Sequence, residues 1–403
     1  MRVLVLAGGF DQIALIEELK LRGHYVILAD YYENPMAKSA ADKHYQASTL
    51  DVDLIEKVAL EEKVDLITTA CTDQALLTVA QVSEKLGLPC YLDYKTGLNV
   101  TNKEYMKQRF VDFSIPTAHH IIIDSSCSLD EKTSHLKYPL IVKPVDCNSS
   151  KGVIKISDKA ALAPAVENAI SLSRTKTAVV EEFIEGREYT VDFWIDNGKP
   201  RLLMASEITK LKNRDSFTIN GCRTLPGLPQ SKVSELERIA ALIADAFELN
   251  NMPMFMQVID DGENIYVLEF SARMGGGTKY RMIELYSSFP IMSVYVDRVL
   301  GKIPTVPKTL TKKSMLLSFI YCTKGIFKEI VGVSPLIEAG IVDEIYQYKS
   351  SGSYFDKAEN SGDRVAGILL TGASDNEIDQ KLTVALEKIQ ILDDTQTDIM
   401  LRL

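Results

Sequence analysis

The chain has 403 residues, of which 46% are hydrophobic and 25% are charged, and its formal net charge is −10. That length exceeds one ordinary hydrophobic core, so we expect two to four domains at roughly 100–200 residues each. The acidic balance disfavours nucleic acid and anionic membrane surfaces as partners. The sequence contains no run of 18 apolar residues, so we also expect no membrane span.

The cysteines and the N-terminus bear on the cell compartment. Six cysteines are scattered along the chain without a CxxC pair or a Cys/His cluster, which argues against structural zinc or a redox dithiol. The opening MRVLVLAGGFDQ is apolar, but Asp11 interrupts it too early for a signal peptide. We therefore expect reduced thiols in a cytoplasmic protein.

Strands alternate with helices over the first part of the chain. RVLVLAGGF is typical of a buried strand that enters a glycine turn. The next helix is expected to have Asp11 as N-cap and Gly23 just after its end. The strand pattern recurs in HYVILAD and VDLITTA. The helix pattern recurs in DVDLIEKVALEEK and TDQALLTVAQVSEKLG. The alternation predicts an α/β domain with an open parallel sheet over residues 1–95.

The pattern changes to α+β after residue 95. Helical segments are expected at NKEYMKQRF and SKVSELERIAALIADAF, with antiparallel strand pairs at YPLIVKPV/GVIKISD, AVVEEFI/REYTVDFWID and PMFMQVID/NIYVLEFSAR. GKIPTVPKTLTKKS is expected to be a linker. The last segment contains VDEIYQYK, RVAGILLTG and a closing helix. We predict domains over residues 96–305 and 306–403.

The stretch NIYVLEFSARMGGG carries polar side chains at every second position of a strand. Leu268, Phe270 and Ala272 are expected to face the core. An unpartnered buried charge would cost several kcal/mol, so the opposite face should line a polar cleft. The side chains expected there are Glu269, Ser271 and Arg273.

These side chains suit a metal beside phosphates. Oxygen atoms of Gln257, Glu269 and Ser271 match the preference of magnesium. Arg273 can bind a phosphate or a carboxylate through two hydrogen bonds, and the glycines that follow allow close backbone approach. The alternative explanation of this stretch is a Glu–Arg pair on a solvent-exposed sheet face, followed by a glycine turn.

The stretch YPLIVKPVDCNSSKGVIKI places a lysine and a small polar loop between two strands. Lys143 ends the first strand, and Ser149, Ser150 and Gly152 can present amides and hydroxyls to phosphate oxygens. No GK[ST] sequence occurs, so this is not a Walker A loop. A solvated turn is the alternative.

In VVEEFIEGREYTVD, a strand edge can pair with adenine through one backbone carbonyl and one backbone amide, while Glu188 can accept from ribose hydroxyls. An ordinary hairpin with exposed acids explains the same stretch.

LAGGFDQ lacks the later glycines of a dinucleotide fingerprint. An NAD-dependent oxidoreductase would therefore rest on Asp30 alone and leave Glu269 and Arg273 unexplained.

In combination and order, these stretches resemble the ATP-grasp superfamily over nearly the whole chain. Within it, the sequence is similar to carbamoyl-phosphate synthetase-like enzymes and L-amino acid ligases. The resemblance implies an ATP-grasp fold: an N-terminal open parallel α/β domain, an ATP-grasp region with a lid at about residues 115–185, and a C-terminal α+β subdomain. The cofactors implied are ATP and Mg²⁺, with Mn²⁺ as a substitute.

The resemblance also implies roles for particular residues. Metal ligands would be Gln257, Glu269 and Ser271, and the catalytic residues Lys143 and Arg273. The substrate would contact Arg223, Arg273, Gly275 and Gly276. ATP would contact Lys103, Lys143, Ser149, Ser150, Gly152, Glu181, Glu182, Phe183, Ile184 and Glu188.

Some positions depart from the family pattern. Many members have Glu where Gln257 stands, Asn where Ser271 stands and Gly near Asn148. The family's histidine is missing from ITKLKNRDSFTINGCRTLPG, where Arg223 is the best candidate to recruit a carboxylate.

The reaction implied is an ATP-dependent, ADP-forming C–N ligation of a small carboxylate to an amine through an acyl phosphate. A homodimer is common among similar proteins. The alternatives are a bicarbonate-using carboxylase or carbamoyl-phosphate-type enzyme, and a non-catalytic ATP-binding protein with a degenerate metal site.

Overall fold

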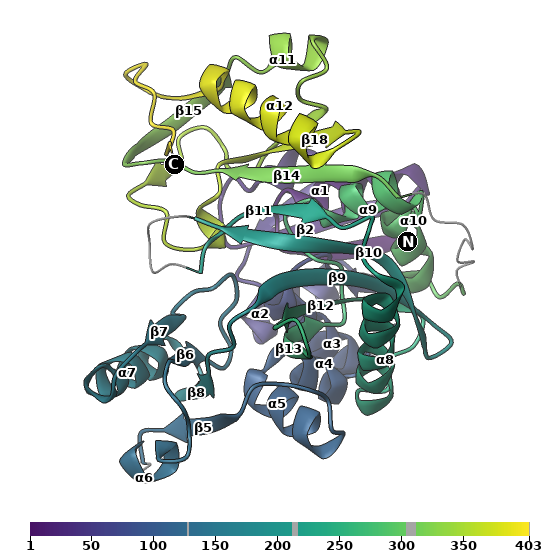
Figure 1. Ribbon diagram of the computed structural model, residues 1–403. Coiled ribbons are helices and arrows are strands. Elements are labelled where there is room, and N and C mark those ends of the chain that lie inside the picture. The colour runs from purple at the N-terminus through teal and green to yellow at the C-terminus, as the bar shows by residue number, and fades with distance from the viewer. Residues whose placement is uncertain (127–128, 212–216, 304–311, 403) are drawn as a thin grey trace.

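The computed structural model describes residues 1–126, 129–211, 217–303 and 312–402 (Figure 1). Over these residues the strands form sheets of four, eight, three and four strands. None of the helices described is long and apolar enough to cross a membrane.

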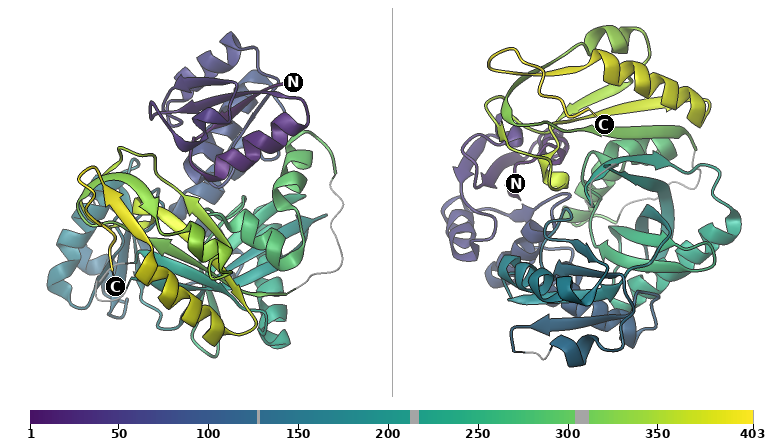
Figure 2. Two further views of the ribbon diagram at one scale, coloured as in Figure 1. Left: turned by 90° about the horizontal axis from the view of Figure 1, so that it is seen from above. Right: turned by 60° about the vertical axis from the view of Figure 1, so that its left-hand side comes forward.

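The N-terminal sheet is parallel, as the alternating pattern predicts, and has the strand order β3-β2-β1-β4. Its strands are β1 (Arg2–Leu6), β2 (Tyr25–Asp30), β3 (Lys43–Gln46) and β4 (Leu66–Thr68). Its helices are α1 (Asp11–Leu21), α2 (Val52–Glu61), α3 (Asp73–Leu86) and α4 (Tyr94–Thr101), with a short 3₁₀ turn η1 (Met36–Ser39). Figure 2 shows this domain set beside the larger body of the molecule.

The predicted N-cap of the first helix is wrong. Helix α1 begins at Asp11 itself, after Phe10. The Asp11 carboxylate instead accepts hydrogen bonds from the backbone amides of Gly277 (3.0 Å) and Thr278 (2.8 Å). The partners lie more than 260 residues away, so no local pattern could reveal the contact.

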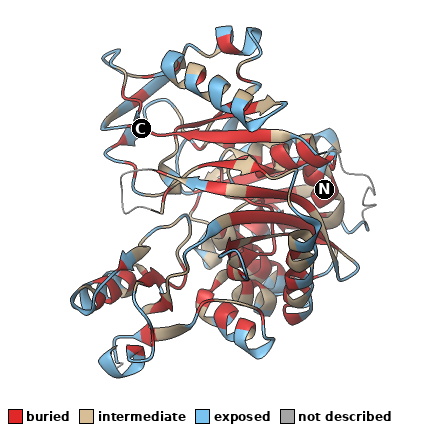
Figure 3. Cartoon of the chain, in the orientation of Figure 1, coloured by how far each residue is buried: buried red, intermediate tan, exposed pale blue. Residues whose placement is uncertain are grey.

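A small lid sheet with the order β5-β8-β6-β7 projects from the lower left of Figure 1. Its strands are β5 (His120–Asp124), β6 (Leu140–Pro144), β7 (Ile154–Ile156) and β8 (Thr177–Glu182). It carries α6 (Leu129–Thr133), α7 (Leu162–Leu172) and η2 (Lys159–Ala161). The lid has its own apolar core, while the outer faces of its helices are exposed (Figure 3).

The central sheet has eight strands in the order β13-β12-β9-β10-β11-β14-β18-β16. These are β9 (Arg187–Asp196), β10 (Lys199–Lys210), β11 (Ile219–Thr224), β12 (Met252–Asp260), β13 (Ile265–Ser271), β14 (Ser314–Ile320), β16 (Glu344–Gln347) and β18 (Ala366–Gly372). Because β14 pairs with β11, this sheet crosses the predicted boundary between residues 305 and 306. Residues 304–311 of the predicted linker lie outside the described residues.

The remaining elements surround this sheet. Helices α5 (Lys103–Asp112), α8 (Gln230–Ala246), α9 (Lys279–Ser287) and α10 (Ile291–Val299) belong to the central part of the chain. The C-terminal elements are β15 (Gly325–Val331), α11 (Ser334–Glu338), β17 (Tyr354–Phe355), η3 (Ser361–Asp363), α12 (Asp375–Lys388) and β19 (Gln390–Asp393). Helix α10 also packs against α1, which joins the N-terminal domain to the body.

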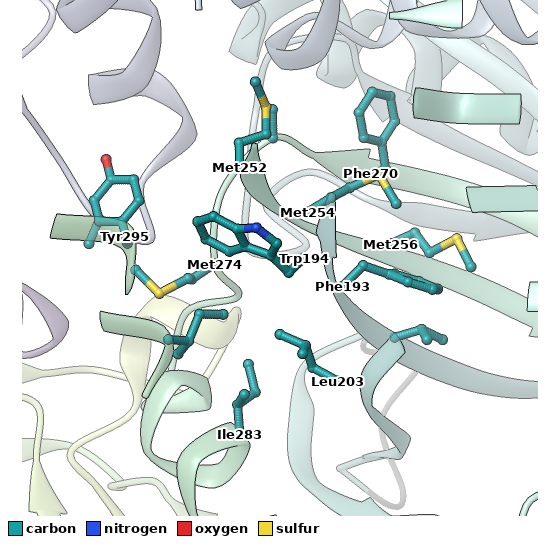
Figure 4. Packing of buried hydrophobic residues seen from close by; sticks show 14 of the residues in the cluster. Phe193, Trp194, Leu203, Met252, Met254, Met256, Phe270, Met274, Ile283 and Tyr295 are labelled. Carbon is teal, nitrogen blue, oxygen red and sulfur yellow. The ribbon is translucent and has the colours of Figure 1, made fainter. Parts of the chain in front are cut away.

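The largest hydrophobic core lies against the central sheet. Trp194 of β9 is completely buried there, and Figure 4 shows it among Met252, Met274 and Tyr295. Burying an aromatic side chain of this size stabilises the fold by several kcal/mol. This core fixes β9 and β12, from which several candidate site residues project.

Replacing Gly332 with alanine is expected to destabilise the C-terminal subdomain by about 2–3 kcal/mol. Gly332 has φ +83°, and a Cβ there would overlap the carbonyl oxygen of Lys388. Gly340→Ala is the matched control, because Gly340 also has a positive φ (+65°) but no atom lies near its Cβ position. Urea unfolding should show the larger loss for Gly332→Ala; equal losses would contradict the steric explanation.

Candidate active site

A pocket lies between the lid sheet and the central sheet, and we call it the interdomain pocket. Its free space, open side included, is about 820 Å³. Eleven residues predicted from the sequence line it: Lys103, Lys143, Ser149, Ser150, Glu181, Glu182, Phe183, Ile184, Glu188, Gln257 and Glu269. The structure thus brings together side chains that are up to 166 positions apart in the sequence.

The loop that follows β6 has an unusual backbone. Ser149 (φ +60°) and Ser150 (φ +63°) both adopt the left-handed conformation that non-glycine residues seldom take. The Ser150 hydroxyl donates to the Phe217 carbonyl (3.1 Å), so the loop is tied to the central part of the chain. Gly152 does not line the pocket. It shapes the loop, because a Cβ there would lie 2.6 Å from Leu172.

The segment after β8 forms one wall of the pocket. The Phe183 amide donates to the Pro139 carbonyl (2.9 Å), and the Lys155 ammonium lies 3.5 Å from the centre of the Phe183 ring. Glu188 is paired with Lys210, a pocket residue from the stretch ITKLKNRDSFTINGCRTLPG. An aromatic ring and a carboxylate therefore face the same space.

The two lysines predicted to bind phosphate are both paired with carboxylates. Lys143 Nζ donates to Glu181, and Lys103 Nζ lies 3.2 Å from Glu269. Burial alone would lower the pKa of Lys103, but the attraction of Glu269 outweighs it and raises that pKa. Lys103 is therefore charged at neutral pH, and both lysines face the pocket.

Two of the three predicted metal ligands face each other across a hairpin. Gln257 of β12 is directly opposite Glu269 of β13, and both line the pocket. The register shifts between Gln257 and Val258, so Leu268 is the extra residue of a β-bulge. Leu268 lines the pocket instead of facing the core as predicted, because the bulge breaks the strict alternation of faces.

The third predicted ligand, Ser271, does not line the pocket. Its side chain is almost fully buried and its hydroxyl donates to Asp73. The oxygen donors that fit a magnesium ion are therefore the Glu269 carboxylate and the Gln257 amide. Oxygen atoms of this kind are the ligands that magnesium prefers.

Arg273 is held by several contacts next to Ser271. Its guanidinium donates twice to Asp73 and once to the Met274 carbonyl (2.6 Å), and it lies over the Phe255 ring at 4.9 Å. Burial alone would lower the pKa of Arg273, and Asp73 outweighs this and raises it. Asp73 is not among the residues predicted from the sequence, because its only local signal is that of an acid in the first turn of α3.

The glycines after Arg273 lie where three parts of the chain meet. Gly275 faces Lys279 and the buried carboxylate of Asp192, and Gly276 faces Cys71 and Asp11 of the N-terminal domain. Burial raises the pKa of Asp192. These glycines lie outside the interdomain pocket, next to Arg273 in the sequence.

The structure does not bring Arg223 to this site. Arg223 lies on β11 and is paired with Asp375 (3.3 Å) and Asp379 of α12. Strand alternation turns its side chain to the face that α12 covers. Lys212 and Arg214, which also belong to ITKLKNRDSFTINGCRTLPG, lie outside the described residues. Asp30 is the last residue of β2, where its carboxylate accepts from the Gly8 and Tyr32 amides.

Comparisons with known proteins agree with this architecture. Residues 136–281 match the model of the ATP-grasp domain family. The carbamoyl phosphate synthase large chain of Clostridium acetobutylicum is 24% identical over 266 residues, which are 65% of this chain and 24% of that protein. The chain spans between about a quarter and a half of the length of the first curated relatives it matches.

Two solved structures resemble nearly the whole chain. The L-amino acid ligase from Bacillus licheniformis has a TM-score of 0.81 at 18% identity, and 98% of each chain is covered. The phosphoribosylglycinamide synthetase from Anaerococcus prevotii has a TM-score of 0.74 at 20% identity, covering 98% of this chain and 99% of that one. The fold is therefore shared with these structures over nearly the whole chain, and residues 136–281, which include strands of both the lid sheet and the central sheet, match the model of the ATP-grasp domain.

Proposed function

We propose that this protein is an ATP- and Mg²⁺-dependent ligase that joins a small carboxylate to an amine through an acyl phosphate. The observation that carries the proposal is the interdomain pocket, which combines Lys103 and Lys143 with the facing oxygen donors of Gln257 and Glu269. The family match and the similarity to ligases of known structure support it.

In this proposal ATP binds between the lid and the central sheet. The adenine lies against Phe183 and pairs with the Glu182–Ile184 backbone, and Glu188 accepts from the ribose. Lys103 and Lys143 turn from their carboxylate partners to the phosphates. Their positive charges neutralise the oxygen atoms of the transferred phosphoryl group.

Gln257 and Glu269 would hold the magnesium ion, which supplies positive charge to the phosphate oxygens when bound. The protein contributes to the remaining steps by positioning the reacting groups. A carboxylate oxygen attacks the γ-phosphorus and ADP leaves; the amine nitrogen then attacks the acyl carbon and phosphate leaves. Arg273 and the glycines after it would orient the carboxylate and the acyl phosphate. No protein nucleophile takes part.

The proposal is tested by measuring ADP and phosphate release with Mg²⁺ and ATP against a panel of small carboxylates, each with and without a panel of amines. We expect release that requires both partners. Release with bicarbonate alone would replace the proposal with a carboxylase. ATP binding without release under any condition of a broad panel would favour a degenerate site.

A further inference from the structure

Lys107 does not line the interdomain pocket but lies directly behind the pocket residue Glu181. We propose that Lys107 is a positioning residue for ATP binding: it keeps Glu181 neutralised when Lys143 turns from that carboxylate to the phosphates. This inference rests on the proposed binding of ATP in the interdomain pocket. It assigns a function to a residue that does not line the pocket.

The three charged groups form a nearly water-free cluster. The side chains of Lys107, Glu181 and Lys143 are 1%, 3% and 9% exposed. Glu181 lies between the two lysines: one carboxylate oxygen accepts from Lys143, and the other is 2.9 Å from Lys107 Nζ. Glu181 and Lys143 line the pocket. One carboxylate therefore serves two cations, and only one of these cations faces the pocket.

Lys107 is held from behind, whereas Lys143 has the pocket in front of it. Lys107 Nζ donates to the Thr117 hydroxyl (2.6 Å), which in turn donates to the Val267 carbonyl (2.7 Å). These contacts fix the ammonium of Lys107 beside Glu181. When Lys143 moves toward a phosphate, Lys107 stays in place.

The energetic consequence follows from burial. A buried carboxylate that loses its only counter-ion is strongly destabilised, by an amount equivalent to roughly 100-fold or more in a binding constant. With Lys107 present, Glu181 keeps a partner after Lys143 leaves. Without Lys107, Lys143 has to remain with Glu181 or leave it unpaired, and ATP loses a contact in either case.

The ionisation of the cluster supports this division of roles. Burial lowers the pKa of Lys107 to about 8, with Glu181 and Glu269 opposing and Lys143 adding to the decrease. For Glu181, burial acts to raise the pKa, but the attraction of Lys107 and Lys143 outweighs it and lowers the pKa to about 2. The neighbouring His120 has its pKa lowered by burial and is neutral above pH 7.

A pH dependence follows. Protonated Lys107 is the form that supports ATP binding, so affinity is constant below the pKa of about 8. Above it, binding has to take up a proton, and affinity falls by up to tenfold per pH unit. Glu181 stays ionised over this range, and the triphosphate of ATP is already fully ionised.

The experiment is isothermal titration calorimetry of MgATP at pH 7 with Lys107→Met, Lys107→Met/Glu181→Gln and the control Lys159→Met. Lys159 is an exposed lid lysine, with 65% of its side chain accessible. We expect the dissociation constant of Lys107→Met to rise on the order of 100-fold. The double variant should recover to within about tenfold of the unmodified protein, and Lys159→Met should be unchanged.

Two further measurements separate this role from a structural one. In the protein without ATP, Lys143 still neutralises Glu181, so the melting temperature of Lys107→Met should fall by only a few degrees. Lys107→Arg remains charged at all accessible pH values, so it should bind ATP at pH 7 and lose the fall in affinity above pH 8. The Lys107→Arg variant also keeps the proposal testable if Lys107→Met does not fold.

The outcomes are distinguishable. If the unmodified protein does not bind MgATP, the proposed function fails and this inference with it. If it binds MgATP and Lys107→Met binds equally well, or if affinity does not change between pH 7 and 9.5, only the inference on Lys107 is overturned.

Discussion

Glu269→Gln is expected to lower ATP turnover by at least about 100-fold while the fold remains intact. The Glu269 side chain faces the interdomain pocket with 33% of its surface exposed, opposite Gln257. Glutamine keeps its shape but removes the charge that would hold magnesium and pair with Lys103. The pair with Lys103 is partly open to solvent, so the stability loss should stay below about 1 kcal/mol. Steady-state ADP release and thermal unfolding are the measurements.

Glu263→Gln provides the matched control for this result. Glu263 lies in the exposed turn between β12 and β13. Its substitution therefore makes the same chemical change on the same hairpin. Its turnover should equal that of the unmodified protein. Turnover retained by Glu269→Gln would refute the assignment of Glu269 as a metal ligand.

Arg273→Lys is expected to reduce kcat by about 100- to 1000-fold, with ATP affinity changed only a few-fold. The planar guanidinium contacts Asp73 twice, the Met274 carbonyl and the Phe255 ring at the same time. A lysine ammonium cannot reproduce this set of contacts. Arg273 lies outside the interdomain pocket, so nucleotide binding should persist while transfer to the carboxylate fails.

The control for this substitution is Arg281→Lys. Arg281 lies on α9, which follows Gly275, Gly276 and Gly277, and pairs with Glu344 (2.6 Å); its side chain is 37% exposed. It should keep its turnover. If Arg273→Lys were as active as Arg281→Lys, Arg273 would have only a structural role through Asp73.

Much of the site could be predicted because strand alternation is a local property. The period of two in NIYVLEFSAR placed Glu269 on the cleft side, and the structure has it there. The same rule was wrong for Leu268, since the bulge opposite Gln257 adds one residue to the hairpin. Nothing in the sequence marks a bulge unless a glycine or another special residue occupies it.

Long-range partners could not be predicted from local patterns. Asp73 reads as an ordinary acid in the first turn of a helix, yet it holds Arg273 from a position 200 residues earlier. Lys103 and Lys107 are one helical turn apart in NKEYMKQRF. The spacing places them on one face of α5, but only the lid sheet determines which of the two faces the pocket and which is buried beside Glu181.

The contacts of Asp11 and Asp73 limit how freely the N-terminal domain can be exchanged for another domain. Both belong to the N-terminal domain, and both reach the segment from Arg273 to Thr278 that follows the central hairpin. This segment is therefore held by two acids from a separate domain. Exchange of the N-terminal domain for another parallel α/β domain would leave the interdomain pocket in place but remove both of these contacts. If Arg273 orients the substrate as proposed, such a recombined protein would keep its activity only where the incoming domain carries acids at these two places.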